Sequence, residues 1–248
     1  MEFFIKTVYN FKKFDSKKYL DEYHSNFSFI EKRILNFLHD FYSQLPDNRK
    51  LELLEIGGGP TVYQLISASK KVNSIVFSEF LKANRREVEK FINNSPAAFN
   101  WDKYFAYVAK LEKNHSLENL KARLRSKIIK VISCDLNKAK PVTLRKKFDI
   151  VSVHFCPESI TSQEDKFVDY MENFFKYVKP GGWLVMGLLR QTHGYSVGKV
   201  FFPAFFIKKD YLEKLLKKHG FYNINIKEII FKLDGINGNI MLSAQKSY

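Results

Sequence analysis

Cysteine is scarce in this chain of 248 residues, which contains two, Cys134 and Cys156. They lack metal-ligand spacing and indicate no disulfide framework, so we expect no bound metal. Proline is also rare, and no apolar run reaches the roughly 18 residues that a transmembrane helix needs. The N-terminal stretch mixes charges with apolar residues and lacks a small-residue cleavage site, which argues against a secretory signal. These absences predict a soluble, cytoplasmic protein with no membrane partner.

The composition is that of a folded domain with an excess of basic residues. Hydrophobic residues make up 45% of the chain, and its length suffices to bury a large core in one domain. The 41 lysines and arginines against 26 acids give a net charge of +15, a balance also found in nucleic-acid-binding proteins. The basic residues are dispersed in short pairs and form no long block. We therefore favour a solvated basic surface and expect no nucleic-acid partner.

The stretch Leu51–Tyr63, LELLEIGGGPTVY, is the most informative part of the sequence. Its first five residues read as a buried strand, three glycines form a turn, and Pro60-Thr61 is expected to open a helix. Glycines let a ligand approach the backbone, and a helix N-terminus with nearby amides can hold a carboxylate or a phosphate. The last glycine of the dinucleotide fingerprint GxGxxG is missing. Glu55, two residues before the first glycine, fits the version of S-adenosylmethionine (AdoMet) methyltransferases better.

Apolar strands alternate with helix-forming segments along the rest of the chain. Six further strands are expected, at about 73–78, 127–133, 148–154, 183–187, 222–232 and 239–244. Helices are expected from Asp15 or Ser16 and at about 28–43, 83–93, 163–178 and 209–219, with loop and helix at 96–107, a linker at 112–120 and a turn at 179–182. This order predicts a doubly wound, mostly parallel α/β sheet that ends in a hairpin, with an antiparallel strand near one edge.

In a doubly wound sheet, ligands bind beyond the carboxyl ends of the strands. The residues expected at those ends are Glu55, Gly57, Gly59, Glu79, Asp135, His154 and Gly187. Glu79 has nearly the spacing that suits a carboxylate bonding ribose hydroxyls. Asp135 is placed to accept a hydrogen bond from an adenine amino group. Each of these two acids can also be a solvated or turn-capping group.

Blocks spread over nearly the whole chain resemble the nicotinamide/phenylethanolamine/thioether N- and S-methyltransferase family, small class I AdoMet-dependent enzymes. The similar blocks are FDSKKYLDEY, LLEIGGGPTVYQL, FSEF with Asn84, PAAFNWDKYFAYVAKLE, SCDL and KPGGWLVM. The block that begins PAAFNW is the most distinctive, because generic methyltransferases do not carry it. The resemblance implies a Rossmann-like seven-stranded sheet with helices on both faces and a C-terminal antiparallel hairpin. It also implies a single domain, with an N-terminal helical lid at 1–45 and the core at 46–248.

The resemblance further implies roles for particular residues in binding AdoMet. Tyr19 of the lid would close over AdoMet, with Tyr23 or His24 beside it. Glu79 would bind the ribose, Asn84 would support the nucleoside, and Asp135 with Leu136 would hold the adenine. The residues that would hold the methionine part and the backbone around it are Glu55, Gly57, Gly58, Gly59, Thr61 and Tyr63. Tyrosine faces near a sulfonium add about 0.5–2 kcal/mol of cation–π attraction, although Tyr19 and Tyr23 can equally be an aromatic face packed on the domain.

The acceptor half of the expected site departs from the family. Members that act on pyridines or amines place a carboxylate just after the KPGG strand, where this chain has Gly187. His154 and Tyr195 are the candidate catalytic residues, because a free imidazole pKa near 6.5 suits proton transfer at neutral pH and Tyr195 follows the next strand. His154 can equally be a hydrogen-bonded strand-end histidine. Glu158 is expected to be a solvated loop charge, and the aromatic residues of 195–206 would make this half apolar.

The expected function is AdoMet-dependent methyl transfer to a small molecule by a monomer, with N-methylation of an amine as the leading version. Displacement would be in line at a carbon bonded to the sulfonium, with catalysis from positioning and exclusion of water. One alternative is attack on the aminocarboxypropyl chain, by group transfer or by a cyclisation that releases methylthioadenosine. A basic nucleic-acid-binding protein, including an RNA-modifying enzyme, and a non-catalytic AdoMet-binding regulator are the other two.

Overall fold

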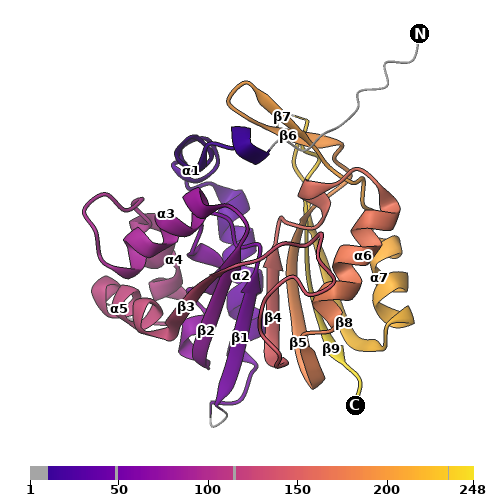
Figure 1. Ribbon diagram of the computed structural model, residues 1–248. Coiled ribbons are helices and arrows are strands. Elements are labelled where there is room, and N and C mark those ends of the chain that lie inside the picture. Colours follow the sequence, from indigo (N-terminus) through magenta and orange to yellow (C-terminus); the bar gives the residue numbers. More distant parts are fainter. Residues whose placement is uncertain (1–10, 48–49, 114–115, 234) are drawn as a thin grey trace.

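The computed structural model describes residues 11–47, 50–113, 116–233 and 235–248. These residues form a seven-stranded sheet of order β3-β2-β1-β4-β5-β9-β8 and a separate two-stranded hairpin, β6–β7. The strands from β3 to β5 pair in parallel, while β9 is antiparallel to both of its neighbours. The doubly wound, mostly parallel sheet predicted from the sequence is therefore confirmed (Figure 1).

The strands of the sheet are β1 Leu51–Ile56, β2 Val72–Glu79, β3 Ile128–Ser133, β4 Phe148–His154, β5 Val178–Leu189, β8 Phe221–Ile229 and β9 Asn239–Lys246. The hairpin strands are β6 Gly194–Val197 and β7 Val200–Pro203. The helices are α1 Ser16–His24, α2 Phe29–Ser43, α3 Lys82–Ile92, α4 Asp102–Leu111, α5 Leu117–Lys127, α6 Glu164–Phe175 and α7 Lys209–Lys218. Apart from α5, every helix and sheet strand overlaps a segment predicted from the sequence.

Capping side chains fix the starts of the first two helices. The carboxylate of Asp15 accepts hydrogen bonds from two backbone N–H groups in the first turn of α1. Ser28 begins α2 with a capping box, in which the Glu31 carboxylate accepts from the Ser28 N–H at 2.6 Å. Such caps satisfy donors that a helix start leaves without partners. The short helix α1 therefore begins where the sequence predicted.

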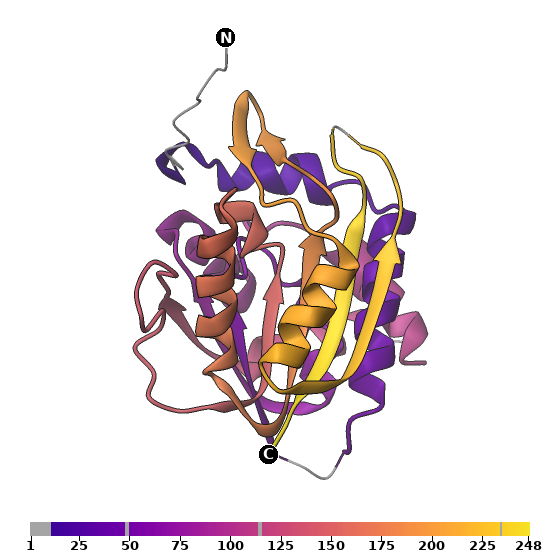
Figure 2. The same ribbon diagram turned by 90° about the vertical axis from the view of Figure 1, so that its right-hand side faces the viewer.

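Helices cover both faces of the sheet and bury an apolar cluster on each. Residues of α2, α3, α4 and α5 pack on one face together with Leu53 of β1. Residues of α6 and α7 pack on the other face together with Leu54. Because successive side chains of a strand point to opposite faces, one apolar strand supplies both clusters. Figure 2 shows α6 and α7 in front of the sheet, with the earlier helices behind it.

The carboxyl ends of the parallel strands lie at the end of the sheet that carries α1 and the β6–β7 hairpin, at the top of Figure 1. The Tyr23 hydroxyl of α1 donates to the Ser196 carbonyl of the hairpin at 2.7 Å, and the Gly198 N–H donates to the Glu22 carboxylate at 2.9 Å. On the other side, Ser16 donates to a side-chain oxygen of α3. Helix α1 is therefore held from both sides across the edge of the sheet where a ligand would bind.

The segment after the glycine turn departs from the prediction. In residues 60–71, all of which are described, the structure has no α-helix but two 3-10 turns, Tyr63–Leu65 and Ala68–Lys70. The Thr61 hydroxyl donates to the Gly58 carbonyl at 2.9 Å, and the Gln64 amide donates to the same carbonyl at 3.4 Å. These side-chain bonds compete with the backbone bonds of a regular helix. The predicted helix was therefore wrong.

Two further predictions were wrong, and one element was missed. The supposed linker at 112–120 contains the start of α5, because the buried Leu120 and Leu124, four residues apart, anchor an otherwise polar helix. Residues 179–182 lie within β5 rather than in a turn before it, since β5 pairs with β4 from Val178 onward through a shift in register. The β6–β7 hairpin lies within the aromatic segment and was not predicted.

Candidate active site

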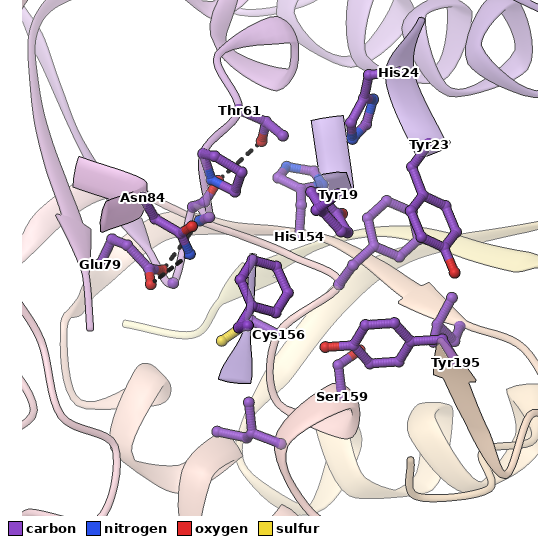
Figure 3. Close-up of a pocket in the computed structure, with 18 of the residues that line it drawn as sticks. Tyr19, Tyr23, His24, Thr61, Glu79, Asn84, His154, Cys156, Ser159 and Tyr195 are labelled. Carbon is purple, nitrogen blue, oxygen red and sulfur yellow. Dashed lines mark hydrogen bonds between the residues drawn. The ribbon is translucent and has the colours of Figure 1, made fainter. Parts of the chain in front are cut away.

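A cavity of about 1390 Å³ lies at the carboxyl ends of the strands, beside α1. Sites for one drug-sized ligand measure about 300–1,000 Å³, so this cavity has room for two small molecules. Figure 3 shows Glu79 and Asn84 together on one side, with Tyr23 and Tyr195 on the other. Apart from Glu55, every site residue predicted from the sequence lines the cavity: Tyr19, Tyr23, Gly57, Gly58, Gly59, Thr61, Tyr63, Glu79, Asn84, Asp135, Leu136, His154 and Tyr195.

The glycine turn after β1 forms one wall of the cavity. Gly57 and Gly59 have positive φ angles of 64° and 61°, which L side chains rarely adopt. The Gly57 N–H donates to the Ser78 carbonyl of β2 at 2.9 Å, which ties the turn to the sheet. A Cβ at Gly57 would collide with Cys156 at the end of β4, whereas a Cβ at Gly59 would meet no described atom within 4 Å. The turn therefore needs glycine for two separate reasons.

Alanine substitutions separate these two reasons. Gly59→Ala adds only the cost of the left-handed backbone, about 1–2 kcal/mol. Gly57→Ala adds the same strain and a collision with Cys156, so we expect a further loss of about 1–3 kcal/mol in the free energy of unfolding. Urea denaturation without ligand measures both variants. Equal losses would show that Cys156 does not pack against the turn as described.

Glu55 lies beneath the glycine turn rather than on the cavity surface. Its side chain is fully buried, and its Oε1 accepts a hydrogen bond from the Gln64 amide at 3.0 Å. The Gln64 amide also reaches the Gly58 carbonyl. Burial raises the pKa of Glu55 to about 8, against the effect of its hydrogen-bond partners. Glu55 is therefore placed to support the turn from below, and its side chain does not reach the cavity.

Glu79 presents a carboxylate on the cavity wall at the end of β2. Its Oε2 accepts from the Gly59 N–H at 3.1 Å, and its Oε1 accepts from the Leu81 N–H at 2.8 Å and the Asn84 amide at 3.0 Å. Burial raises the pKa of Glu79 above its ordinary value, although these donors lower it. The Asn84 Oδ1 accepts from Ser16 of α1 at 2.6 Å. The predicted ribose-binding carboxylate is thus held by the glycine turn and linked to the lid helix.

Asp135 and Leu136 follow β3 on the same side of the cavity. The Asp135 Oδ1 accepts from the Asn137 N–H at 3.1 Å. The Tyr170 hydroxyl of α6 donates to the side-chain oxygen of Asn137 at 2.9 Å. Asn137 and Tyr170 also line the cavity, and neither was predicted. Together these residues place hydrogen-bonding groups beside an apolar side chain, which suits a planar ring with polar edges.

Aromatic rings of α1 gather at another part of the cavity. The Tyr19 and Tyr23 ring centroids are 5.1 Å apart, and the His24 ring lies 5.4 Å from Tyr19 and 5.2 Å from Tyr63. The His24 Nδ1 lies 3.2 Å from the Tyr104 hydroxyl. Burial lowers the pKa of His24 to about 3, so the ring is neutral. Its Nε2 has no hydrogen-bond partner among the described residues, which leaves one polar atom for a ligand.

The contacts of α1 predict that a bound ligand protects it from proteolysis. Opening the lid breaks the Tyr23–Ser196 bond together with ligand contacts, so S-adenosylhomocysteine should slow tryptic cutting at Lys17 and Lys18 several-fold. Cutting at Lys208, before α7, is the internal control and should not change. Tyr23→Phe, which lacks the hydroxyl, should be cut faster without ligand. Equal rates with and without ligand would contradict a lid.

His154 and Tyr195 lie in the half of the cavity built by β4, β5 and the hairpin. Burial keeps the pKa of Tyr195 well above 10, and its ring stacks on Phe202 with centroids 5.4 Å apart. The His154 Nε2 lies 3.0 Å from the Ser152 hydroxyl. Burial lowers the pKa of His154 to about 3, so this imidazole does not take up a proton at neutral pH. The structure therefore supports a neutral, hydrogen-bonding role for His154.

Glu158 was expected to be a solvated charge but is fully buried. Its Oε1 accepts from the Leu189 N–H at 2.8 Å, while its Oε2 has no partner within the described part of the chain. Burial raises its pKa to about 7. Its charge also contributes to the raised pKa values of Tyr19 and Tyr195, which places it near the acceptor half. An acid between Pro157 and Ser159 gave no sequence signal of burial.

Comparisons with known proteins agree with the fold and the cavity. The model of the NNMT/PNMT/TEMT family matches residues 2–247. Nicotinamide N-methyltransferase of Homo sapiens is 30% identical over 227 residues, 88% of this chain and 85% of that protein. Indolethylamine N-methyltransferase of Oryctolagus cuniculus is 29% identical over 182 residues, 72% and 68% of the two chains. Phenylethanolamine N-methyltransferase of Macaca mulatta is 25% identical over 205 residues, 78% and 73% of the two.

Solved structures share the fold at low identity. A SAM-dependent methyltransferase of Methanosarcina mazei superposes with a TM-score of 0.56 at 15% identity, covering 84% of this chain and 97% of that one. DhpI with S-adenosylhomocysteine gives 0.55 at 12% identity, covering 94% and 93%. The fold is therefore that of the class I methyltransferases. Within the described segments, no helix is long and apolar enough to cross a bilayer, and no three His, Cys, Asp or Glu side chains gather as a metal site.

Proposed function

The chain belongs to the NNMT/PNMT/TEMT family and is an AdoMet-dependent methyltransferase, and from this premise we propose that it methylates the nitrogen of a small-molecule amine. The relatives described above are N-methyltransferases. None of them supports the aminocarboxypropyl alternative. We further propose that it works as a monomer in the cytoplasm without a nucleic-acid partner, as expected from the dispersed charge.

The observation that carries an amine acceptor is the buried carboxyl of Glu158. A carboxyl with an unpaired oxygen is costly to bury, and its pKa of about 7 leaves it partly ionised at neutral pH. Its electrostatic effect on Tyr19 and Tyr195 shows that its charge is felt at the cavity wall. Such a charge attracts an ammonium group to the apolar acceptor half.

The residues of the other half fit AdoMet. The glycine turn offers a wall without side chains, Glu79 offers acceptors for ribose hydroxyls, and Asp135 with Leu136 flanks a space for adenine. The unpaired Nε2 of His24 offers a donor for a carboxylate. Tyr19 and Tyr23 present aromatic rings near these groups. We propose these contacts for the cofactor, with Thr61, Asn84 and Glu55 supporting the walls.

Catalysis in this site is a matter of placement. AdoMet supplies a methyl group on a positively charged sulfur. The amine nitrogen forms a bond to that carbon as the carbon–sulfur bond breaks, and the ammonium product later releases a proton to water. The chain holds the two reactants in line and excludes solvent, with α1 and the hairpin covering the cavity. Tyr195 stays protonated and can donate a hydrogen bond, so no proton transfer to the enzyme is required.

Mass spectrometry of the reaction products tests the proposal. The protein is incubated with AdoMet alone and with a panel of arylalkyl amines, and the sulfur by-product is identified. We expect S-adenosylhomocysteine and a methylated amine only when an amine is present. Methylthioadenosine formed from AdoMet alone would overturn amine methylation. Nicotinamide should be a poor acceptor, because position 187 carries no carboxylate, and efficient turnover of it would contradict that expectation.

A further inference from the structure

Three residues meet at one point of the acceptor half. A Cβ at Gly187 of β5 would lie 2.9 Å from the His154 Nδ1 and 3.2 Å from the Phe155 Cζ. The imidazole of His154 therefore fills the space that a side chain at position 187 would need. His154 and Phe155 both line the cavity. We call these three residues, His154, Phe155 and Gly187, the acceptor niche.

The nitrogen that faces Gly187 has no partner. The His154 Nδ1 is buried, and within the described residues nothing is hydrogen-bonded to it. Native proteins rarely leave such atoms unpaired, and those that remain often serve function. The Nε2 on the other side of the ring is paired with Ser152 at 3.0 Å. The ring is therefore anchored at one nitrogen and unpaired at the other.

The Ser152 bond indicates which nitrogen carries the hydrogen. The Ser152 hydroxyl also lowers the pKa of Glu55, which is the effect of a donor directed at that carboxyl. With its hydrogen on the Glu55 side, Ser152 accepts from the N–H at Nε2 of His154. The neutral imidazole then presents a bare lone pair at Nδ1. A ligand in the niche would meet a hydrogen-bond acceptor, not a donor.

Phe155 controls access to this lone pair. It has a φ of 51°, in the left-handed region that bulky residues avoid, and its N–H donates to the Gly187 carbonyl at 2.6 Å. Its half-buried ring reaches the same point as Nδ1. Strained backbone at a ligand site persists only where surrounding contacts hold it. Rotation of this ring is the movement that opens Nδ1 to the cavity.

We propose that His154 selects acceptors by accepting a hydrogen bond from the N–H of an uncharged primary or secondary amine, in a niche that Phe155 opens and that Gly187 leaves free. This inference rests on the proposed amine methylation. The bond orients the nitrogen so that its lone pair remains free to attack the methyl carbon. A tertiary amine or a pyridine, whose neutral nitrogen has no hydrogen, cannot make it. His154 takes no proton in this scheme, in keeping with its low pKa.

A matched pair of acceptors and three variants test the selection. The acceptors are a secondary arylalkyl amine and its N-methylated tertiary counterpart, compared by kcat/KM at one pH. His154→Leu should lower kcat/KM for the secondary amine about tenfold, the value of one hydrogen bond, and leave the tertiary amine unchanged. His154→Asn, whose Oδ1 can replace Nδ1, should retain most of the preference. Gly187→Ala, which keeps the imidazole but crowds Nδ1, should lose it.

Calorimetry with S-adenosylhomocysteine serves as the control, since all three variants should bind it as the unmodified protein does. A uniform loss for both acceptors in His154→Leu, with cofactor binding intact, would overturn the selection while leaving amine methylation in place. A preference for the tertiary amine in the unmodified protein would also overturn it. Absence of methyl transfer to every amine would instead refute the proposed function itself.

Discussion

Glu79→Ala should weaken the binding of AdoMet about ten- to a hundredfold. The carboxylate is fixed by the N–H groups of Gly59 and Leu81 and by the Asn84 amide, so its position is set before the ligand arrives. A hydrogen bond to a charged group contributes roughly 1.5–3 kcal/mol, which corresponds to that loss in affinity. The variant also leaves the Gly59 N–H without its acceptor, and this adds to the loss.

Isothermal calorimetry with S-adenosylhomocysteine measures the change. Glu89→Ala, on the exposed side of α3, removes the same charge at a distance from the cavity and should bind normally. Circular dichroism of both variants checks that the fold is retained. An unmodified protein that gives no heat of binding would contradict the cofactor site as a whole, whereas normal affinity in Glu79→Ala would contradict the ribose role alone.

The second large effect concerns stability and Glu55. Burial raises its pKa from 4.5 to about 8, so between these pH values the folded chain holds a proton that the unfolded chain has released. Unfolding then releases a proton, and stability falls as pH rises through this window. Glu55→Gln keeps the shape and the Oε1 acceptor for Gln64 but has no proton to lose. Relative to this variant, the unmodified protein should lose about 3–4 kcal/mol of unfolding free energy between pH 5 and 8.

Urea denaturation at several pH values, without ligand, measures this difference. Comparing each protein with its own value at pH 5 cancels the contributions of His24, His154 and Glu158, which both proteins share. Glu89→Gln removes one surface charge and should not reproduce the trend. A difference between unmodified protein and Glu55→Gln that stays constant with pH would show that Glu55 is already ionised in the folded state.

Much of the fold and of the cofactor half could be predicted because local signals and tertiary structure agree there. Apolar runs predicted the sheet, the Asp15 and Ser28 caps predicted the helix starts, and the strand-end rule brought Glu79 and Asp135 to one cavity. The glycine turn was found because positive φ angles demand glycine. In each case one residue type answers one local physical requirement.

The remaining features depend on contacts between distant segments. Whether the acids Glu55 and Glu158 face the cavity or lie buried behind it is decided by the packing of β4, β5 and the hairpin, which periodicity does not encode. The acceptor niche requires His154 and Gly187 to be neighbours across two strands, as the register between β4 and β5 makes them. The helix expected after Pro60 failed because Gln64 and Thr61 bond to the turn before it.

The double attachment of α1, to Asn84 on one side and to the hairpin on the other, has a consequence for the catalytic cycle. Each turnover needs a fresh cofactor and the departure of the spent one, and both must pass a helix that is held from both sides. Methyl transfer within the closed cavity does not require α1 to move. The pace of the cycle is then governed by how often the helix detaches, and a spent cofactor that leaves slowly acts as an inhibitor of the next round.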